Sequence, residues 1–402
     1  MTLPPRIARL AALAAKPIRR IVGLMSGTSL DGLDIALCAI SGAGTNTRAV
    51  LEQFLTRPYS AAEKERLRSV VSQPHVALSD VCILNAWIAE IHGRAVLAAL
   101  AEWGVPAAEI DLLASHGQTV YHAPASWRPA GDPRGPARHA TLQLGDGDLV
   151  AVCTGLPTVS DFRQKEIAGG GQGAPLAPYV EALLYRGPEP RILLNLGGIA
   201  NFTWLPPLGS TELPRCGDTG PANTLLDRAA RQAAPGGPGF DPDGGAAAVG
   251  RVHAGLLARL KAHPYFALPC PKSTGPEIFG EAYLSAALEA GGAPPGNDLL
   301  ATLTRLTVDT IVDTLRREVP DLAGARVYVS GGGQHNRTLL RWLGEALPML
   351  RIEDSGALGT PPDAKEALLF AVLANEAVAG PGFPAADGSG RTLAFGKLSF
   401  PD

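Results

Sequence analysis

Apolar and polar positions alternate twice in the same way along this chain, and each time the pattern predicts a β-hairpin. The first hairpin covers residues 21–37, where two apolar runs flank the turn Ser-Gly-Thr-Ser, and the second covers residues 191–205, where the turn contains Gly-Gly. A tight turn of Gly, Ser, Thr or Asn between apolar runs is typical of a hairpin. A Walker A loop would instead need Gly-Lys-Ser/Thr at a helix start, and the first turn has no lysine. Phosphates bound at these turns would therefore contact backbone N–H groups and hydroxyls.

A third glycine-rich element lies at residues 327–340. A short apolar strand runs into Gly331-Gly332-Gly333, and leucines then recur at helical spacing, which predicts a strand, a loop and a helix. Two hairpins followed by a glycine corner is the order of the actin-like, sugar-kinase superfamily, which the chain resembles in this respect. The resemblance implies an α/β fold of two actin-like, ribonuclease H-like domains that flank a deep nucleotide-binding cleft. The hairpins would hold the phosphates and the corner the adenosine.

The pattern between and after these elements completes an αβ order. It predicts a third strand at residues 50–55, a helix that Asp80 caps and Gly104 ends, and a buried strand at residues 110–115. That strand ends at His116-Gly-Gln-Thr119, and strand ends carry ligand sites in α/β sheets. Late in the chain, Asp363 and Glu366 have the spacing of a capping box at the start of a helix.

Length and these elements together predict two domains, because 402 residues exceed a single core. We assign residues 1–18 to a non-core extension, residues 19–155 with 360–402 to an N-terminal domain, and residues 156–359 to a C-terminal domain. Residues 123–140 and 234–245 are rich in Pro and Gly and are expected to be surface loops.

Composition narrows the partners. Apolar residues make up 46% of the chain and charged residues 18%, with a net charge of −3, which argues against nucleic acid or an anionic membrane and favours a small substrate. Five cysteines without a Cys-x-x-Cys pair fit a reducing cytoplasm. No apolar run is expected to reach the ~20 residues of a membrane span. His116 and His122 lack a third ligand at a recognised spacing, so zinc is not expected.

Nine motifs, in order along nearly the whole chain, resemble those of the anhydro-N-acetylmuramic acid kinase family. They are residues 25–34 (MSGTSLDGLD), 115–122 (SHGQTVYH), 141–146 (TLQLGD), 161–163 (DFR), 170–176 (GGQGAPL), 195–201 (NLGGIAN), 218–223 (DTGPAN), 271–275 (PKSTG) and 330–336 (SGGGQHN). The resemblance implies an ATP-dependent cytoplasmic enzyme of peptidoglycan recycling. Such an enzyme opens the 1,6-anhydro ring of N-acetylmuramic acid with water and phosphorylates the freed O6.

Attack of water on the anomeric carbon requires a base, and a carboxylate suits an oxocarbenium-like centre. Asp161 is the predicted base, because it follows the β-like stretch 158–160 and precedes a flexible glycine-rich segment. Glu166 is the alternative base. Pairing with Arg163 or capping of a turn is the structural alternative for Asp161.

The remaining site residues follow from the motifs. Predicted substrate contacts are His116, Gln118, Thr119 and Glu366, of which Glu366 could instead serve only the capping box and Gln118 and Thr119 only a strand terminus. The predicted ATP contacts are Gly27, Thr28, Ser29, Leu30, Asp31, Gly32, Leu33, Asp34, Gly197, Gly198, Asn201, Gly331, Gly332, Gly333 and Asn336. Mg²⁺ is expected with ATP, and Asp31, Asp34 and Asp218 are acidic candidates near the phosphates, but no ligand is assigned.

Two departures and two alternatives stay open. Asn195 stands where superfamily relatives often carry an aspartate, and Pro276 where an arginine commonly follows Ser-Thr-Gly in the family. A sugar or carboxylate kinase of the same superfamily would use Asp161 on a substrate hydroxyl. A regulatory ATPase would use the same clamp as a switch, but it would make the motifs at 116–122 and 161–176 superfluous. A homodimer is compatible with the sequence and not required by it.

Overall fold

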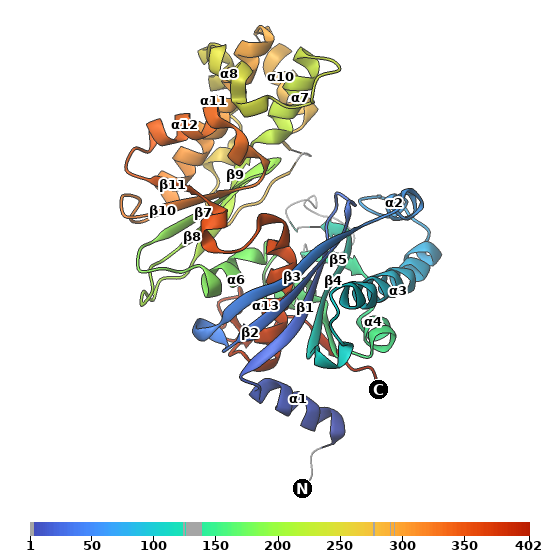
Figure 1. The fold of residues 1–402 in the computed structure, drawn as a ribbon. Coiled ribbons are helices and arrows are strands. Elements are labelled where there is room, and N and C mark those ends of the chain that lie inside the picture. Colours follow the sequence, from blue (N-terminus) through green and yellow to red (C-terminus); the bar gives the residue numbers. More distant parts are fainter. Residues whose placement is uncertain (1–3, 124, 126–138, 276–277, 290, 293) are drawn as a thin grey trace. The chain divides into compact units, whose positions relative to one another are not determined.

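The computed structural model describes residues 4–402 apart from 124, 126–138, 276–277, 290 and 293, and it divides into two units (Figure 1). Unit 1 comprises the chain up to residue 184 and residues 363–402, and unit 2 comprises residues 185–362. The expected boundary after residue 155 therefore differs from the structure, because residues 156–184 belong to unit 1. The reason is pairing: the strand at 158–160 is bonded to two strands of unit 1.

Unit 1 contains one large sheet with helices on both faces. Its elements are α1 (Pro5–Ala15), β1 (Ile18–Ser26), β2 (Gly32–Ser41), β3 (Arg48–Pro58), α2 (Ala61–Arg68), α3 (Leu78–Glu102), β4 (Leu112–Ala123), β5 (Ala140–Leu144), α4 (Gly147–Thr154), β6 (Thr158–Ser160), α5 (Phe162–Ala168), α6 (Ala177–Leu184), α13 (Lys365–Ala379), β12 (Phe383–Pro384), β13 (Thr392–Leu393) and β14 (Lys397–Ser399). The strand order is β14-β6-β4-β1-β2-β3, and β5 pairs with β4. The expected first hairpin is confirmed, since β1 and β2 are antiparallel neighbours.

Both faces of this sheet are buried, which explains the nearly continuous apolar run of the first strand. Side chains alternate along β1, so that Ile21 and Met25 enter the cluster packed on α13, while Val22 and Leu24 enter the cluster packed on α3. Between them, Gly23 faces α13, and a Cβ built there would lie 1.9 Å from the Ala367 carbonyl oxygen. The helix backbone thus contacts the strand backbone directly.

Two helices of unit 1 differ from expectation. α1 is not separate from the core, because Leu13 is 7% exposed and belongs to the cluster under α13. The sequence was expected to contain no segment that could span a membrane. By length and composition alone, α3 is long and apolar enough to do so. Its residues Leu84, Ile88 and Val96 are buried in the core of unit 1, as in the core helix of a globular domain.

Unit 2 repeats the same sheet. Its elements are β7 (Arg191–Leu196), β8 (Ile199–Leu205), β9 (Arg215–Pro221), α7 (Asn223–Ala233), α8 (Gly245–Val249), α9 (Ala254–Lys261), α10 (Glu281–Glu289), α11 (Gly296–Glu318), β10 (Arg326–Ser330), α12 (Arg337–Ala346) and β11 (Arg351–Asp354). The strand order is β11-β10-β7-β8-β9. β7 and β8 form the expected second hairpin, and β10 lies parallel to β7.

The two sheets share order and strand direction. In each unit the first two strands form a hairpin, and the third joins the second antiparallel. Two parallel strands then follow on the other side of the first strand: β4 and β6 in unit 1, and β10 and β11 in unit 2. This repeated topology is that of two actin-like domains of the ribonuclease H-like type. The weak resemblance between the two hairpin sequences therefore reflects a duplicated fold.

Helix starts were predicted less well than strands. Asp80 lies in the first turn of α3, but the N-cap is Ala77. Asp363 belongs to a short 3₁₀ turn (Pro362–Ala364), and α13 begins after it with Ala364 as N-cap and no side-chain cap. The expected capping box of Asp363 and Glu366 is therefore wrong. Gly380 ends α13 as expected.

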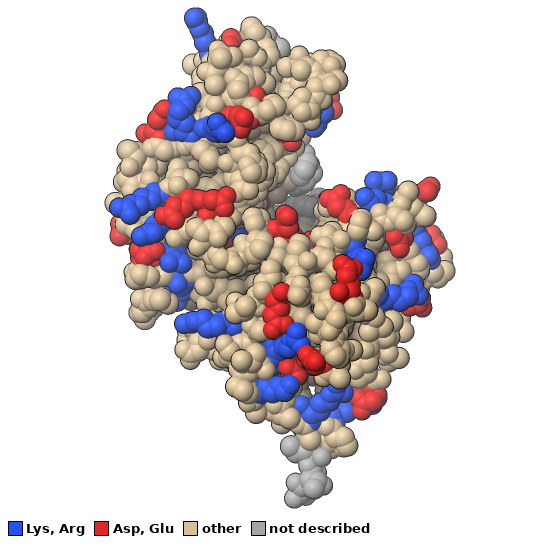
Figure 2. Space-filling view, in the orientation of Figure 1, with Lys and Arg blue, Asp and Glu red and all other residues tan. Residues whose placement is uncertain are grey.

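Positive and negative side chains are interspersed over the visible face of each unit (Figure 2). Several form ion pairs, such as Arg20 with Glu52 and Glu109 in unit 1 and Arg326 with Glu189 in unit 2. The visible surfaces are thus mixed in sign, as the small net charge suggests.

Candidate active site

The first glycine turn joins β1 to β2 in unit 1. Thr28 and Ser29 are exposed at its tip, whereas Leu30 is 4% exposed and has φ of 59°. A leucine in the left-handed region costs roughly 1–2 kcal/mol, and burial of its side chain in the core offsets that cost. Such strain persists where the surroundings over-determine the backbone, which is typical of functional sites.

The predicted ATP contacts of this turn separate into two groups. Thr28, Ser29 and Asp31 are exposed and can reach a phosphate. Leu30 and Leu33 are core residues, and a Cβ at Gly32 would lie 2.4 Å from the carbonyl oxygen of Arg57 on β3. These three residues shape the turn, and a ligand could contact only their backbone groups. Asp34 accepts a hydrogen bond from Thr56 Oγ1 at 2.6 Å.

The structure does not leave His116 and Gln118 available for a sugar. β4 continues through them to Ala123, so the expected strand end is absent there. His116 is 3% exposed, with Nδ1 on the Gly117 carbonyl oxygen at 2.9 Å and Nε2 accepting from Arg163 Nε at 2.8 Å. Burial and then the Arg163 charge hold the pKa of His116 well below its usual value, so the ring is neutral. Gln118 is 0% exposed, and both ends of its amide are bonded.

Thr119 is half-buried, and its hydroxyl accepts a hydrogen bond from Gln143 Nε2 at 3.2 Å. Of the predicted contacts on this strand, Thr119 thus stays a proposed sugar contact. His116 instead orients Arg163, whose guanidinium also donates to the Gly173 carbonyl oxygen at 2.9 Å. The bonds from Arg163 therefore join β4 to the glycine-rich segment 169–173.

Asp161 lies between β6 and α5 with φ of 57° and makes no side-chain cap. Its carboxylate is 3.0 Å from Lys397 Nζ on β14, the strand beyond β6 at the edge of the sheet. The expected alternatives, pairing with Arg163 and capping of a turn, are therefore not what the structure shows. The side chain is 28% exposed and its partner lies on the side of β6 away from β1.

The two glutamates that the sequence singled out, Glu166 and Glu366, have different surroundings. Glu166 is 8% exposed and accepts from the Gly173 backbone N–H and from the Tyr179 hydroxyl. Burial raises its pKa, but its bonds indicate that it shapes the glycine-rich segment. Glu366 is exposed at the start of α13, close enough to Arg163 and Asp34 for their charges to interact. Glu366 can therefore still contact a ligand.

In unit 2, the second hairpin turn is held by backbone bonds. The Gly197 carbonyl accepts from the Asn223 N–H at 3.1 Å, and the Gly198 carbonyl accepts from the Ala222 and Thr224 N–H groups at 2.9 and 3.1 Å. Asn223 Nδ2 also donates to the Leu196 carbonyl oxygen at 2.9 Å. The start of α7 thus fixes this turn. Gly331, with φ of 81°, lies against Leu196, where a Cβ would approach to 2.8 Å.

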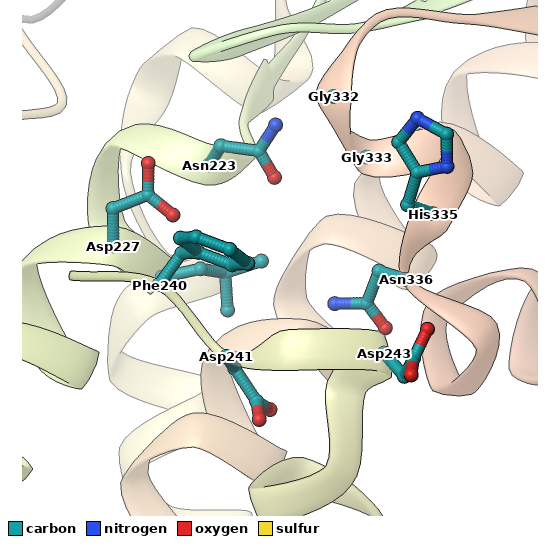
Figure 3. Close-up of a pocket in the computed structure, with 10 residues that line it drawn as sticks. Asn223, Asp227, Phe240, Asp241, Asp243, Gly332, Gly333, His335 and Asn336 are labelled. Carbon is teal, nitrogen blue, oxygen red and sulfur yellow. The ribbon is translucent and has the colours of Figure 1, made fainter. Parts of the chain in front are cut away.

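A cavity of about 320 Å³ opens beside the glycine corner in unit 2 (Figure 3). Its lining joins the predicted Gly332, Gly333 and Asn336 to residues of α7 and of the loop after it. The additional residues are Asn223, Leu226, Asp227, Phe240, Asp241, Asp243 and His335. Its size is within the usual range for small-molecule sites, roughly 300–1,000 Å³. A planar ring over the exposed Phe240 and polar groups facing the carboxylates would suit a nucleoside.

Asn336 offers this cavity only part of its side chain, because its Oδ1 accepts the Leu339 N–H at 2.9 Å as the N-cap of α12. Asp227 faces the cavity (Figure 3), and burial raises the pKa of its carboxyl, with Arg231 acting in the opposite direction. Neither Asp227 nor Phe240 could be identified from the sequence, since both lie outside the glycine motifs. The aromatic residue within the loop 234–245 was the only available signal.

The motifs at residues 218–223 and 271–275 are in contact at Asp218. Its Oδ2 accepts the Thr274 N–H at 2.8 Å, and its backbone carbonyl accepts the Tyr265 hydroxyl at 2.9 Å. In the sheet, Asp218 is paired with Asn201, which is paired in turn with Asn195 beside the second turn. A half-buried carboxylate is thus oriented near the second glycine turn within one unit. Pro276, the departure noted after Thr274, lies outside the described residues.

Comparison with known proteins agrees with the motifs. The family model described as anhydro-N-acetylmuramic acid kinase matches residues 19–400. The chain belongs to the anhydro-N-acetylmuramic acid kinase family. A kinase of this name from Pseudoalteromonas atlantica is 44% identical over 98% of this chain and 99% of its own length. One from Caldanaerobacter subterraneus is 36% identical, with 97% and 99% covered, and one from Streptomyces avermitilis is 42% identical, with 88% and 87% covered.

Solved structures show a more distant likeness. The activator of the 2-hydroxyisocaproyl-CoA dehydratase from Clostridium difficile aligns with a TM-score of 0.39 and 12% identity, covering 89% of this chain and 95% of that chain. A ROK family glucokinase from Streptomyces griseus, in complex with glucose and AMPPNP, aligns with a TM-score of 0.32 and 16% identity, covering 89% and 98%. The assignment to the anhydro-N-acetylmuramic acid kinase family rests on the sequence matches and not on these alignments.

A buried histidine below the first turn makes the stability of unit 1 depend on pH. His92 is 1% exposed, and burial lowers its pKa to about 4. Because the unfolded chain binds this proton with a pKa of about 6.5, the contribution to stability is complete above that value and is lost as the pH falls towards 4. At pH 5.5 the loss amounts to roughly 1 kcal/mol.

We expect His92→Gln to remove this part of the pH dependence. Urea unfolding at pH 7.5 and 5.5 should show a difference in unfolding free energy that is roughly 1 kcal/mol smaller in the variant than in the native chain. His116 titrates in the same direction and is present in both proteins, so it cancels in the comparison. An equal pH dependence in the two proteins would contradict the assignment.

Proposed function

We propose that this chain couples the hydrolytic opening of 1,6-anhydro-N-acetylmuramic acid to transfer of the γ-phosphoryl group of ATP onto O6, as a step of peptidoglycan recycling in the cytoplasm. Membership of the anhydro-N-acetylmuramic acid kinase family is the observation that carries this proposal. The two glycine turns and the cavity at the corner support it, because exposed polar groups and a cavity of about 320 Å³ lie at motif residues.

The proposed reaction forms two bonds and breaks two. Water attacks C1, and the bond from C1 to O6 breaks. O6 attacks the γ-phosphorus, and the bond from that phosphorus to the β,γ-bridging oxygen breaks, which releases ADP. One proton of the water passes to a base, and the other stays on the new C1 hydroxyl. The base must therefore lie within about a sugar ring and one water molecule of the γ-phosphate.

We propose Asp218 as this base. Asn201 lies three residues after the second turn along β8, a span of about 10 Å. Asp218 is the partner of Asn201 on the neighbouring strand β9. The Thr274 N–H orients its carboxylate. A base held in one orientation by a neighbouring group is the usual arrangement in general-base catalysis.

Asp161, the base predicted from the sequence, is the alternative. Its left-handed backbone is the kind of strain found at active sites, but its carboxylate is paired with Lys397. The Lys397 ammonium group, 3.0 Å away, occupies the Asp161 carboxylate. Asp161 can act on the water only if this ion pair opens.

For the nucleotide, we propose that Thr28, Ser29 and the backbone of residues 27–31 and 197–198 bind phosphates, and that the cavity of Figure 3 binds the adenosine. Thr119 and Glu366 are the proposed sugar contacts. In the described part of the chain no three His, Cys, Asp or Glu side chains gather into a metal site. Mg²⁺ is commonly held by one or two carboxylates, waters and the phosphates themselves. Asp31 and Asp34 would provide the carboxylates, and the ion would neutralise phosphate charge.

The path of oxygen tests the reaction. We expect turnover in ¹⁸O-water to place label in the C1 hydroxyl of the product and none in its phosphate, measured by mass spectrometry of the sugar phosphate and its fragments. Label in the phosphoryl group would mean that water attacks ATP, and the coupled reaction would be wrong.

Measurement of ATP consumption with and without the anhydro sugar separates the other candidate functions. A kinase that acts on a free hydroxyl would consume ATP with another sugar and leave the anhydro ring intact. A regulatory ATPase would hydrolyse ATP at the same rate with and without anhydro-N-acetylmuramic acid. We expect ATP consumption to depend on this sugar.

A further inference from the structure

A chain of buried polar side chains runs under the first phosphate turn of unit 1. His92 Nε2 lies 2.8 Å from the Tyr59 hydroxyl, which lies 2.9 Å from Ser26 Oγ. Ser26 Oγ donates to Gln118 Oε1 at 2.6 Å, and Gln118 Nε2 donates to the Gly27 carbonyl oxygen at 3.2 Å. All four side chains are less than 9% exposed. Neither Tyr59 nor His92 belongs to a motif of the family resemblance.

The direction of every hydrogen bond in this chain follows from its last member. Gln118 Nε2 faces two carbonyl oxygens, those of Gly27 and Thr119, so the amide nitrogen must be on that side and Oε1 on the side of Ser26. The single hydroxyl hydrogen of Ser26 therefore goes to Gln118, and Ser26 accepts from Tyr59.

The same logic continues to the histidine. Tyr59 donates its hydrogen to Ser26, so its oxygen must accept from His92 Nε2–H. His92 is then neutral with its hydrogen on Nε2, which agrees with its buried position and lowered pKa. Its Nδ1 has no hydrogen-bond partner in the described part of the chain. The donors thus run in one direction, from His92 to the carbonyl oxygen of Gly27.

The end of this chain orients a peptide group of the turn. In a trans peptide the carbonyl oxygen and the following N–H point in opposite directions. Because the Gly27 carbonyl is bonded inward to Gln118 and also accepts the Leu30 N–H at 3.3 Å, the Thr28 N–H points outward from the exposed tip. Outward N–H groups are what binds a phosphate at a turn. On the other side of the tip, the buried Leu30 with its positive φ anchors the backbone.

In unit 2 the carbonyl groups of the turn are oriented by backbone donors instead of side chains. There the carbonyl groups of Gly197 and Gly198 are bonded inward by backbone N–H groups at the start of α7. Backbone donors are insensitive to substitution, whereas the first turn depends on four side chains. We propose that Tyr59 and His92 are positioning residues for ATP, and that they act through Ser26 and Gln118 to aim the Thr28 N–H at a phosphate. This proposal rests on the proposed function of the turn as an ATP phosphate site.

Tyr59→Phe tests the proposal by removing the hydroxyl in the middle of the chain. We expect KM for ATP to rise roughly fivefold to tenfold, as befits one lost buried hydrogen bond, while KM for the anhydro sugar stays within about twofold. Ser26→Ala removes the next link and should give the same pattern, so the test survives if one variant fails to fold. His92→Gln keeps an amide donor towards Tyr59 and should restore much of the ATP affinity that His92→Leu loses.

Tyr283→Phe is the matched control, because the Tyr283 hydroxyl donates to the Leu260 carbonyl oxygen at 2.7 Å in unit 2, in a region without motif residues. This variant should lose stability without any change in KM for ATP. If Tyr59→Phe and Ser26→Ala also lost only stability, the positioning role would be overturned. Failure of the native chain to use ATP with the anhydro sugar would instead refute the proposed function.

Discussion

Asp218→Asn is expected to lower kcat by roughly a hundredfold or more, because general-base catalysis contributes about 10²–10⁴-fold. Asparagine keeps an oxygen that can accept the Thr274 N–H, so the fold and the position of the side chain should persist. It cannot take the proton of the attacking water. Steady-state assays of ADP release with anhydro-N-acetylmuramic acid should therefore show a fall in kcat, while ATP affinity stays nearly unchanged.

Asp161→Asn is the matched control for this prediction. It makes the same change in another half-exposed aspartate and removes the charge that pairs with Lys397. If Asp218 is the base, Asp161→Asn should keep kcat within about threefold of the native value. A collapse of kcat in Asp161→Asn together with near-normal turnover in Asp218→Asn would return the role to Asp161, as the sequence pattern alone suggested.

The glycine elements could be predicted from the sequence because local chemistry decides them. A turn of Ser-Gly-Thr-Ser between apolar runs has few alternatives to a hairpin, and Gly331 has φ of 81° against Leu196. Both hairpins and the corner are present as expected. The duplicated sheet is built on them, since the two hairpin strands come first along the chain in each sheet.

The domain boundary could not be predicted because it depends on distant pairing. β6 has only three residues, and its neighbour β14 lies at Lys397–Ser399. No local pattern in residues 156–184 shows which sheet they join. The start of α13 was also predicted wrongly, because a 3₁₀ turn at Pro362–Ala364 stands where the capping box was expected.

The direction of side chains was the other limit. The residues at 116–119 carry sugar-binding chemistry in their types, but the structure turns Gln118 towards the first glycine turn and His116 towards Arg163. The donor chain from His92 joins residues from β1, β3's end, α3 and β4, and no spacing in the sequence indicates that they meet. Likewise, the loop 234–245 was expected only as surface, yet Phe240 and Asp241 line the cavity.

Gly23→Ala is expected to destabilise unit 1 by roughly 3 kcal/mol or more, at the upper end of the usual cost of overpacking. The added methyl would lie 1.9 Å from the Ala367 carbonyl oxygen and 3.0 Å from the Ala371 nitrogen. Both are backbone atoms of α13, so no side chain can rotate away. Either the helix must lift from the sheet or the strand must bend, and each exposes apolar surface around Ile21 and Met25. Urea unfolding of the native chain and the variant measures the loss.

Gly27→Ala provides the comparison, because the same methyl there would have Ser29 Oγ as its nearest neighbour at 3.7 Å. Its unfolding free energy should stay within about 1 kcal/mol of the native value. Equal stability of the two variants would show that α13 tolerates a wider spacing from β1. The result also bears on the substrate side of the site, since α13 begins at Lys365 and carries Glu366. A helix displaced by Gly23→Ala would move this proposed sugar contact, so KM for the anhydro sugar should rise in any variant protein that still folds.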